Sequence, residues 1–344
     1  MEIHFKENNG PVDEGIDKLI EQVSDIRRPE IVREMILASL KAGQEDDGHV
    51  DLKLMNTSLK EMRFTAKAFQ PYQHIRKVTV FGSARTKPDS TIYQMAYEFG
   101  KKLGELGYMV ITGGGPGIMQ AALEGAGPDY SFGVNIRLPF EQKPNPILQG
   151  NSKYISYKYF FNRKVAFLKE SDAIALFPGG FGTMDEAMET STLVQTGKRN
   201  PVPIILIDEP GGTYWTRWIE YIKDNLLAPG YISPSDLKLF SQVDSPDEAV
   251  ERIHRFYFRY HSLRFVEKRL VIRLISELDE QKVERLKTDF SDILLPGGSM
   301  YRSGPLQQES DEPELSHLPR LIVDFKRTDF GRLKELIDSV NMDG

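Results

Sequence analysis

One stretch of the sequence, FPGGFGTMDEAMET at positions 177–190, has the residue types best suited to binding a phosphate. An apolar run followed by glycines predicts a strand that turns tightly into a helix. The N-terminus of such a helix presents free N–H groups and roughly half a positive charge to a ligand. We therefore expect a phosphate-binding turn here, formed by Gly179, Gly180, Gly182 and Thr183.

Three carboxylates follow this turn in the first two turns of the predicted helix: Asp185, Glu186 and Glu189. Acids at a helix start interact favourably with the helix dipole, by about 0.3–1 kcal/mol each, which accounts for Asp185 and can also account for Glu189. A carboxylate beside bound phosphate also repels it, so one acid should face another part of the ligand. Glu186 lies three residues after Thr183, on the same side of the helix and one turn deeper. We expect Glu186 to be that acid.

Cations lie upstream, in residues 151–170, which contain five basic residues and one acid. Arg163 and Lys164 fall within a predicted helix that leads into the strand before the glycine turn. Two interpretations are open. The cations form a solvated face with their stems lying on apolar surface, or they supply positive charge to the same crevice.

Two more predicted strands end in glycine-bearing turns, FGSAR at 81–85 and TGGGPG at 112–117. Glycines there can simply permit tight turns. However, the carboxyl ends of parallel strands meet at one edge of a sheet, where ligands bind. Ile118 stands where G-x-G-x-x-G requires its last glycine, and the sequence has no G-x-x-x-x-G-K-[ST]. Neither the usual dinucleotide motif nor a P-loop is present.

The surrounding elements must position these turns. Short apolar strands alternate with helices over residues 71–262, which predicts a doubly wound, Rossmann-like parallel sheet covered on both faces. A helix is expected over 245–262 to close this α/β domain. Residues 1–70 should form a helical extension. Residues 263–344 follow the order of a small α+β unit, with an exposed loop at QQESDEPELSH.

Composition limits the class of protein. The chain has 344 residues, no cysteine and a net charge of −6, so it has no disulfide framework and no thiolate metal site. The acidic balance argues against a nucleic-acid partner. The sequence shows no apolar run of membrane-spanning length and no signal-peptide core. We expect a cytoplasmic protein without a membrane partner.

Four motifs in these turns and helices together resemble those of a known family. FGSAR, GGGPGIMQAA, NRK at 162–164 and PGGFGTMDE occur in this order along the chain. Over about 72–262 the chain resembles the LOG ("Lonely guy") family of cytokinin riboside 5′-monophosphate phosphoribohydrolases, also labelled possible lysine decarboxylases. The resemblance implies that Arg163 and Glu186 are the catalytic pair. It also implies that these residues bind the substrate: Ser83, Gly114, Gly115, Phe160, Lys164, Gly179, Gly180, Gly182 and Thr183.

The implied reaction cleaves the N-glycosidic bond of a nucleoside 5′-monophosphate, giving a free base and ribose 5-phosphate. A carboxylate would stabilise the oxocarbenium-like sugar and activate water, and no metal or organic cofactor is required. The family implies a homodimer or larger homo-oligomer. Short members have methionine and histidine before the catalytic pair, where this sequence has Phe160, Phe161 and Asn162. Phe160 could stack on a base, and the change leaves the preferred base open.

Two other functions fit parts of the pattern. Lysine decarboxylases hold pyridoxal phosphate on a lysine that commonly follows a histidine, and this sequence has no His-Lys dipeptide. A non-catalytic carrier of a phosphorylated ligand would keep the glycine turns without needing Glu186 and Arg163. Release of base from nucleoside monophosphates distinguishes the enzyme from both.

Overall fold

The computed structural model describes residues 10–45, 48–138 and 145–342. The chain divides into two compact units, Met1–Phe64 and Thr65–Gly344. The first contains α1 (Pro11–Glu21), α2 (Pro29–Glu45) and most of α3 (His49–Phe69). None of the helices in the described residues is long and apolar enough to span a membrane.

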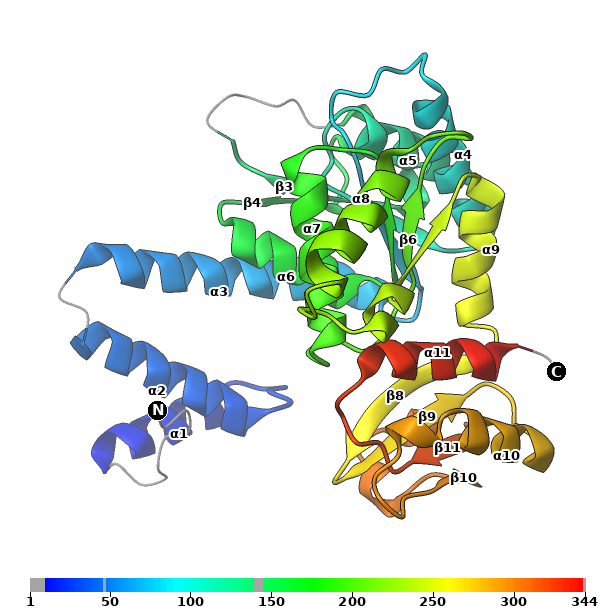
Figure 1. Ribbon diagram of the computed structural model, residues 1–344. Coiled ribbons are helices and arrows are strands. Elements are labelled where there is room, and N and C mark those ends of the chain that lie inside the picture. Colours follow the sequence, from blue (N-terminus) through cyan, green and yellow to red (C-terminus); the bar gives the residue numbers. More distant parts are fainter. Residues whose placement is uncertain (1–9, 46–47, 139–144, 343–344) are drawn as a thin grey trace. The chain divides into compact units, whose positions relative to one another are not determined.

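The second unit contains a seven-stranded sheet in the order β4-β3-β2-β1-β5-β6-β7 (Figure 1). Every neighbouring pair in it is parallel. The strands are β1 (Lys77–Phe81), β2 (Met109–Thr112), β3 (Ser131–Ile136), β4 (Tyr154–Tyr157), β5 (Ala173–Leu176), β6 (Ile204–Ile207) and β7 (Phe240–Val243). The central strands are buried along their whole length.

Helices cover both faces of this sheet. One core joins the sheet to α4 (Thr91–Glu105), α5 (Ile118–Ala126) and α9 (Pro246–Phe256). The other joins it to α6 (Phe160–Glu170), α7 (Phe181–Gln195) and α8 (Tyr214–Ile222). This confirms the predicted Rossmann-like, doubly wound α/β fold. The end of α3 belongs to the second core, where Phe69 stacks on Phe132 with ring centroids 4.1 Å apart.

A second sheet follows, antiparallel and in the order β10-β11-β9-β8. It comprises β8 (Tyr260–Val266), β9 (Arg269–Leu274), β10 (Met300–Ser303) and β11 (Arg320–Val323). Helices α10 (Glu280–Asp289) and α11 (Phe330–Asn341) pack on the same face of it. The stretch PRLIVDFKR forms the central strand β11 of this small sheet rather than joining the main one.

Two local expectations were wrong. The helix expected over 245–262 ends at Phe256, and β8 begins at Tyr260, so the expected boundary at 262 falls inside a strand of the second sheet. The loop at QQESDEPELSH is not uniformly exposed, because Glu309 is buried. Its carboxylate accepts hydrogen bonds from Arg273 and Arg320, which lie on β9 and β11.

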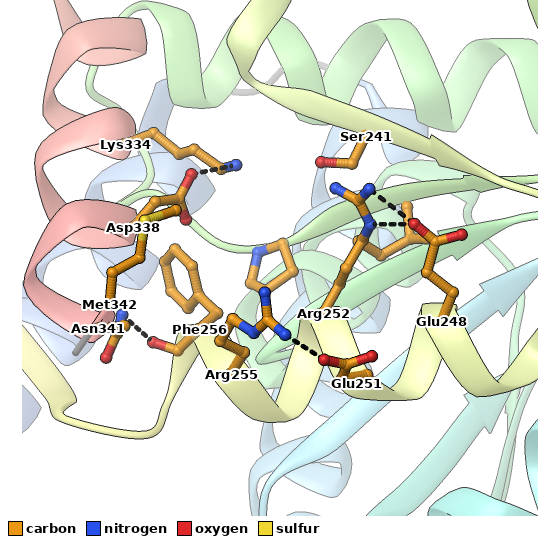
Figure 2. A pocket seen from close by; sticks show the side chains of 12 residues that line it. Ser241, Glu248, Glu251, Arg252, Arg255, Phe256, Lys334, Asp338, Asn341 and Met342 are labelled. Carbon is orange, nitrogen blue, oxygen red and sulfur yellow. Dashed lines mark hydrogen bonds and ion pairs between the residues drawn. The ribbon is translucent and has the colours of Figure 1, made fainter. Parts of the chain in front are cut away.

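The small sheet is joined to the α/β domain where α11 meets α9, around a cavity of about 220 Å³ (Figure 2). Six charged side chains line it, and each forms an ion pair within the cavity wall. The pairs are Lys334 with Asp338, Arg252 with Glu248, and Arg255 with Glu251. Asn341 on α11 donates a hydrogen bond to the carbonyl oxygen of Phe256 at 2.6 Å.

Candidate active site

Main-chain hydrogen bonds join the three glycine turns at the carboxyl edge of the main sheet. The N–H of Ser83 donates to the carbonyl of Pro178 at 3.0 Å, and the N–H of Ile118 donates to the carbonyl of Ser83 at 3.1 Å. Gly117, with φ of +68°, lets the second turn approach the first, since a Cβ there would lie 2.3 Å from the carbonyl oxygen of Ser83. The turns therefore form one continuous surface.

A cleft of about 980 Å³ opens at this edge. The predicted site residues among those that line it are Ser83, Arg163, Gly179, Gly180, Gly182 and Thr183. Arg85, Met119 and Phe181 line it as well, and the motifs had not singled them out. Phe181 is 97% exposed at the start of α7, so the rim of the cleft presents a free aromatic ring.

The glycine turn has the geometry of an anion site. Helix α7 begins at Phe181, and the N–H groups of Thr183 and Met184 both donate to the carbonyl of Gly180 at 3.1 Å. The N–H groups before them, at the start of the helix, have no main-chain acceptor among the described residues and can meet a ligand. At Gly179 a Cβ would lie 2.1 Å from the hydroxyl oxygen of Thr183, so only glycine fits there without rearrangement.

Tyr214 on α8 holds this turn from behind. Its hydroxyl donates to the carbonyl of Gly179 at 2.6 Å. The main-chain N–H of Tyr214 in turn donates to the carboxylate of Asp208 at 2.8 Å. Sequence reasoning missed Tyr214, because nothing local marks a tyrosine 35 residues beyond the turn as its support.

Glu186 lies one helical turn below Thr183 and is only 7% exposed. Within the described residues, its Oε2 atom is buried and has no hydrogen-bond partner. Burial raises the pKa of Glu186 to about 7. Lys164 and Arg163 act against that rise in the pKa, whereas Glu189 and Asp185 reinforce it. A carboxylate in this state can exchange a proton near neutral pH.

Arg163 is half-buried and interacts with the charge of this carboxylate, and burial lowers the pKa of its guanidinium. The ring of Phe167 lies 5.1 Å from its central carbon. Its Nε atom has no hydrogen-bond partner in the part of the chain that the structure describes. The open alternative of a solvated face therefore does not hold for Arg163, which lines the cleft and interacts with the charge of Glu186.

Lys164 points along the α6–α7 contact. Its Nζ atom lies 2.7 Å from Asp185, 2.5 Å from Glu189 and 3.6 Å from Glu186. Asp185, Glu186 and Glu189, the three acids that follow the glycine turn, therefore all lie within 4 Å of one ammonium group. Unlike Arg163, Lys164 is not among the described residues that line the cleft.

Gly114, Gly115, Phe160 and Glu186 also lie outside the described lining of this cleft. Gly114 has φ of +68°, and its N–H donates to the hydroxyl of Thr112 at 3.0 Å. A Cβ at Gly115 would lie 2.8 Å from the terminal carbon of Met119, which itself lines the cleft. Phe160 is exposed at the start of α6. Among the described residues, no group of three His, Asp or Glu side chains is placed to hold a metal ion.

These features define a class: a Rossmann-like α/β protein with a glycine turn at a helix N-terminus, and with a buried carboxylate and a half-buried guanidinium that interact through their charges. Residues 116–253 match the family model described as "Possible lysine decarboxylase". The probable cytokinin riboside 5′-monophosphate phosphoribohydrolase LOGL2 of Oryza sativa subsp. japonica is 28% identical over 205 residues, 58% of this chain and 80% of that protein. The corresponding LOG3 enzyme of Arabidopsis thaliana is 23% identical, over 53% of this chain and 83% of that protein.

The resemblance seen in the motifs is thus confirmed: the family model and the LOG enzymes match the α/β region of this chain, at modest identity over about half of the chain. A solved structure of the molybdenum cofactor carrier protein from Chlamydomonas reinhardtii is also similar. It is 18% identical, with a TM-score of 0.36, over 53% of this chain and 97% of that one.

Proposed function

We propose that this protein hydrolyses the N-glycosidic bond of nucleoside 5′-monophosphates, releasing the base and ribose 5-phosphate. The observation that carries the proposal is the buried Glu186, whose Oε2 atom lacks a partner in the described structure. Burying a polar atom without a partner costs about 1–3 kcal/mol. A bound ligand that meets this atom would offset that cost. The names of the relatives support the same reaction at the level of the family.

The glycine turn would hold the 5′-phosphate. Its N–H groups and the hydroxyl of Thr183 form charge-assisted hydrogen bonds, each worth about 1.5–3 kcal/mol. This binding energy is gained away from the reacting carbon and can be used to orient the sugar. Tyr214 would keep the turn in shape through its bond to the carbonyl of Gly179.

Glu186 would act on the sugar. As the bond from C1′ to the base nitrogen breaks, positive charge develops on the sugar, and an ionised carboxylate stabilises it. The same carboxylate accepts a proton from the water that adds to C1′, and the departing base takes up a proton. One water is consumed, and no electrons are transferred. Arg163 would neutralise charge on the phosphate or on the departing base.

The base itself is set by other residues. Phe160, Phe161 and Asn162 stand where short family members have methionine and histidine, and Phe160 is exposed enough to stack on a ring. We therefore propose nucleoside 5′-monophosphates as the substrate class, with cytokinin riboside monophosphate as one member to be tested. Gly114 and Gly115 are proposed for the ribose-phosphate side, and Ser83 is proposed to bind the substrate from the first loop.

A homodimer or larger homo-oligomer in the cytoplasm completes the proposal. Large apolar side chains are exposed along α6 and along the first half of α7: Phe160, Phe161, Val165, Phe181 and Met188. Apolar side chains gathered in this way mark an interaction surface. Light scattering after gel filtration measures the oligomeric state, and a monomer at micromolar concentration would contradict this part.

The test is incubation with a panel of nucleoside monophosphates, with products separated by chromatography. We expect free base and ribose 5-phosphate in equal amounts. Binding of a nucleotide without base release would favour a phosphorylated-ligand carrier instead. In competition, AMP should bind more tightly than ADP, ATP or adenosine, because the turn accommodates one phosphate and Glu186 repels more charge. ATP binding tightest would contradict a one-phosphate site.

A further inference from the structure

The contact between α6 and α7 concentrates charge beside the candidate active site. Three carboxylates lie within five residues of α7, and a single ammonium group from α6 reaches all of them. Asp185 and Glu189 are the two close partners of Lys164, at 2.7 and 2.5 Å. Glu186 is the third, at 3.6 Å, and is the most deeply buried of the three acids.

The geometry separates the two oxygens of Glu186. Oε1 faces the ammonium group of Lys164. Oε2 is buried and has no partner among the described residues. The ammonium is held in place by the outer two acids, so it acts on Glu186 through its charge rather than through a short hydrogen bond.

We propose that Lys164 is a positioning residue that keeps Glu186 ionised in the working pH range, and that Asp185 and Glu189 hold Lys164 in place. This inference rests on the proposed function, because it assigns a role in the same site. It differs from the expectation that Lys164 binds the substrate. This arrangement also explains why a helix beside a phosphate site begins with three acids. Asp185 and Glu189 hold Lys164, and the charge of Lys164 acts on Glu186.

The charges that face Glu186 come from both helices and act in opposite directions. Arg163 and Lys164 on α6 favour its ionised form. Glu189 and Asp185 on α7 favour its protonated form, as burial does. Tyr157 on β4 faces Arg163 rather than Glu186. Removing Lys164 must therefore favour protonation of Glu186, whereas removing the charge of Glu189 must favour its ionisation.

The opposite signs make a sharp test. The pH dependence of kcat/KM for base release is measured from pH 5.5 to 9 in the full-length protein. In Lys164→Met the acid limb of this pH profile, where kcat/KM falls as Glu186 becomes protonated, should move to higher pH by about one unit or more. In Glu189→Gln the acid limb should move to lower pH, because Asp185 still holds Lys164 at 2.7 Å while the repulsion from Glu189 is lost. Lys164→Arg keeps the charge and should keep the limb of the parent protein.

Lys169 provides the matched control, because it lies on the same helix and pairs instead with the adjacent Glu170. Lys169→Met removes the same charge from α6 and should leave the limb unchanged. A limb that stays in place in Lys164→Met, or that moves the same way in Lys164→Met and Glu189→Gln, would overturn the proposal. A purely structural role would lower kcat without moving the limb.

A second readout does not require turnover. Carboxyl carbons of ¹³C-labelled glutamate are titrated by NMR, and the Glu186 signal is assigned by its loss in Glu186→Gln. The titration midpoint should rise in Lys164→Met and fall in Glu189→Gln. If the protein releases base from no monophosphate, the proposed reaction fails, yet these midpoints still decide the role of Lys164. Unchanged midpoints in an active enzyme would reject Lys164 alone.

Discussion

Two hollows in the second unit differ in how the charged side chains in and around them are paired. The cavity between α9 and α11 is lined by six charged side chains, and each has an ion-pair partner in its own wall (Figure 2). At the cleft above the main sheet, Arg163 in the lining and Glu186 just outside it each keep a buried polar atom without a partner in the described residues. Satisfied charges hold two parts together, whereas unsatisfied ones store a cost that a ligand can relieve.

The largest effect should come from the unsatisfied carboxylate. Glu186→Gln keeps the shape of the side chain but removes its charge and its capacity to take a proton. We expect kcat for base release to fall at least ~100-fold with the fold retained. Product chromatography measures the rate, and circular dichroism checks the fold. Near-normal turnover would show that Glu186 has no part in the mechanism. The unpaired carboxylate would then not distinguish the cleft from the paired cavity in function.

The same substitution should change how stability depends on pH. The pKa of Glu186 is raised to about 7 in the folded protein, whereas an unfolded glutamate titrates near ~4.3. The folded state therefore binds this proton more tightly, and the contribution of Glu186 to stability falls as the pH rises from about 5 to 8. The loss is about 2–3 kcal/mol over that range. Urea unfolding at pH 5 and pH 8 should show a smaller pH difference in Glu186→Gln, which should be the more stable protein at pH 8.

At the paired cavity, the expected effect is on stability alone. Lys334→Met leaves the carboxylate of Asp338 without its partner at 2.7 Å, and burial already raises the pKa of that carboxyl. We expect a loss of about 1–2 kcal/mol in unfolding free energy, since Asp338 is only partly enclosed. Adding Asp338→Leu should restore much of the loss. Turnover should match the parent protein, and a large fall in kcat would show that this cavity is linked to the cleft.

The smallest effect tests the fit of the glycine turn. Gly179→Ala places a Cβ 2.1 Å from the hydroxyl of Thr183 and 3.0 Å from the nitrogen of Ser83. We expect the affinity for AMP to fall about tenfold, or about 1.4 kcal/mol. Gly180→Ala meets no atom within 4 Å and should lose less affinity. Isothermal titration calorimetry compares the two, and equal losses would mean that the turn is not held at Gly179.

The sequence predicted elements well where the signal was local. The strands β1, β2, β3, β5 and β6 are apolar runs, and most of them end in glycines, so their type and order could be predicted. The strand β4 was missed because Tyr154–Tyr157 alternates at a sheet edge inside a basic stretch. The strand β8 was missed because no glycine or proline separates it from the helix before it. Its alternating residues simply continued the expected helical pattern.

The site divides in the same way. Glycines and Thr183 could be predicted because turn chemistry depends on adjacent residues. The ion-pair partners of Lys164 could not be predicted, since they depend on how α6 packs against α7. The burial of Glu309 depends on arginines from two strands, one of them 36 residues earlier in the chain. Contacts of that range are set by tertiary packing and leave no periodic mark in the sequence.

The hydrogen bonds that join the glycine turns involve only main-chain atoms of Ser83, Ile118 and Pro178. Every residue type supplies a carbonyl, and every type but proline supplies an N–H, so these hydrogen bonds can form after most side-chain replacements. Substitutions around the rim, at Arg85, Met119 or Phe181, can therefore alter what the cleft accepts without moving its floor. The joined glycine turns can therefore be kept in evolution while the side chains around them change. Descendants of this chain could acquire new ligands by changes at the rim alone.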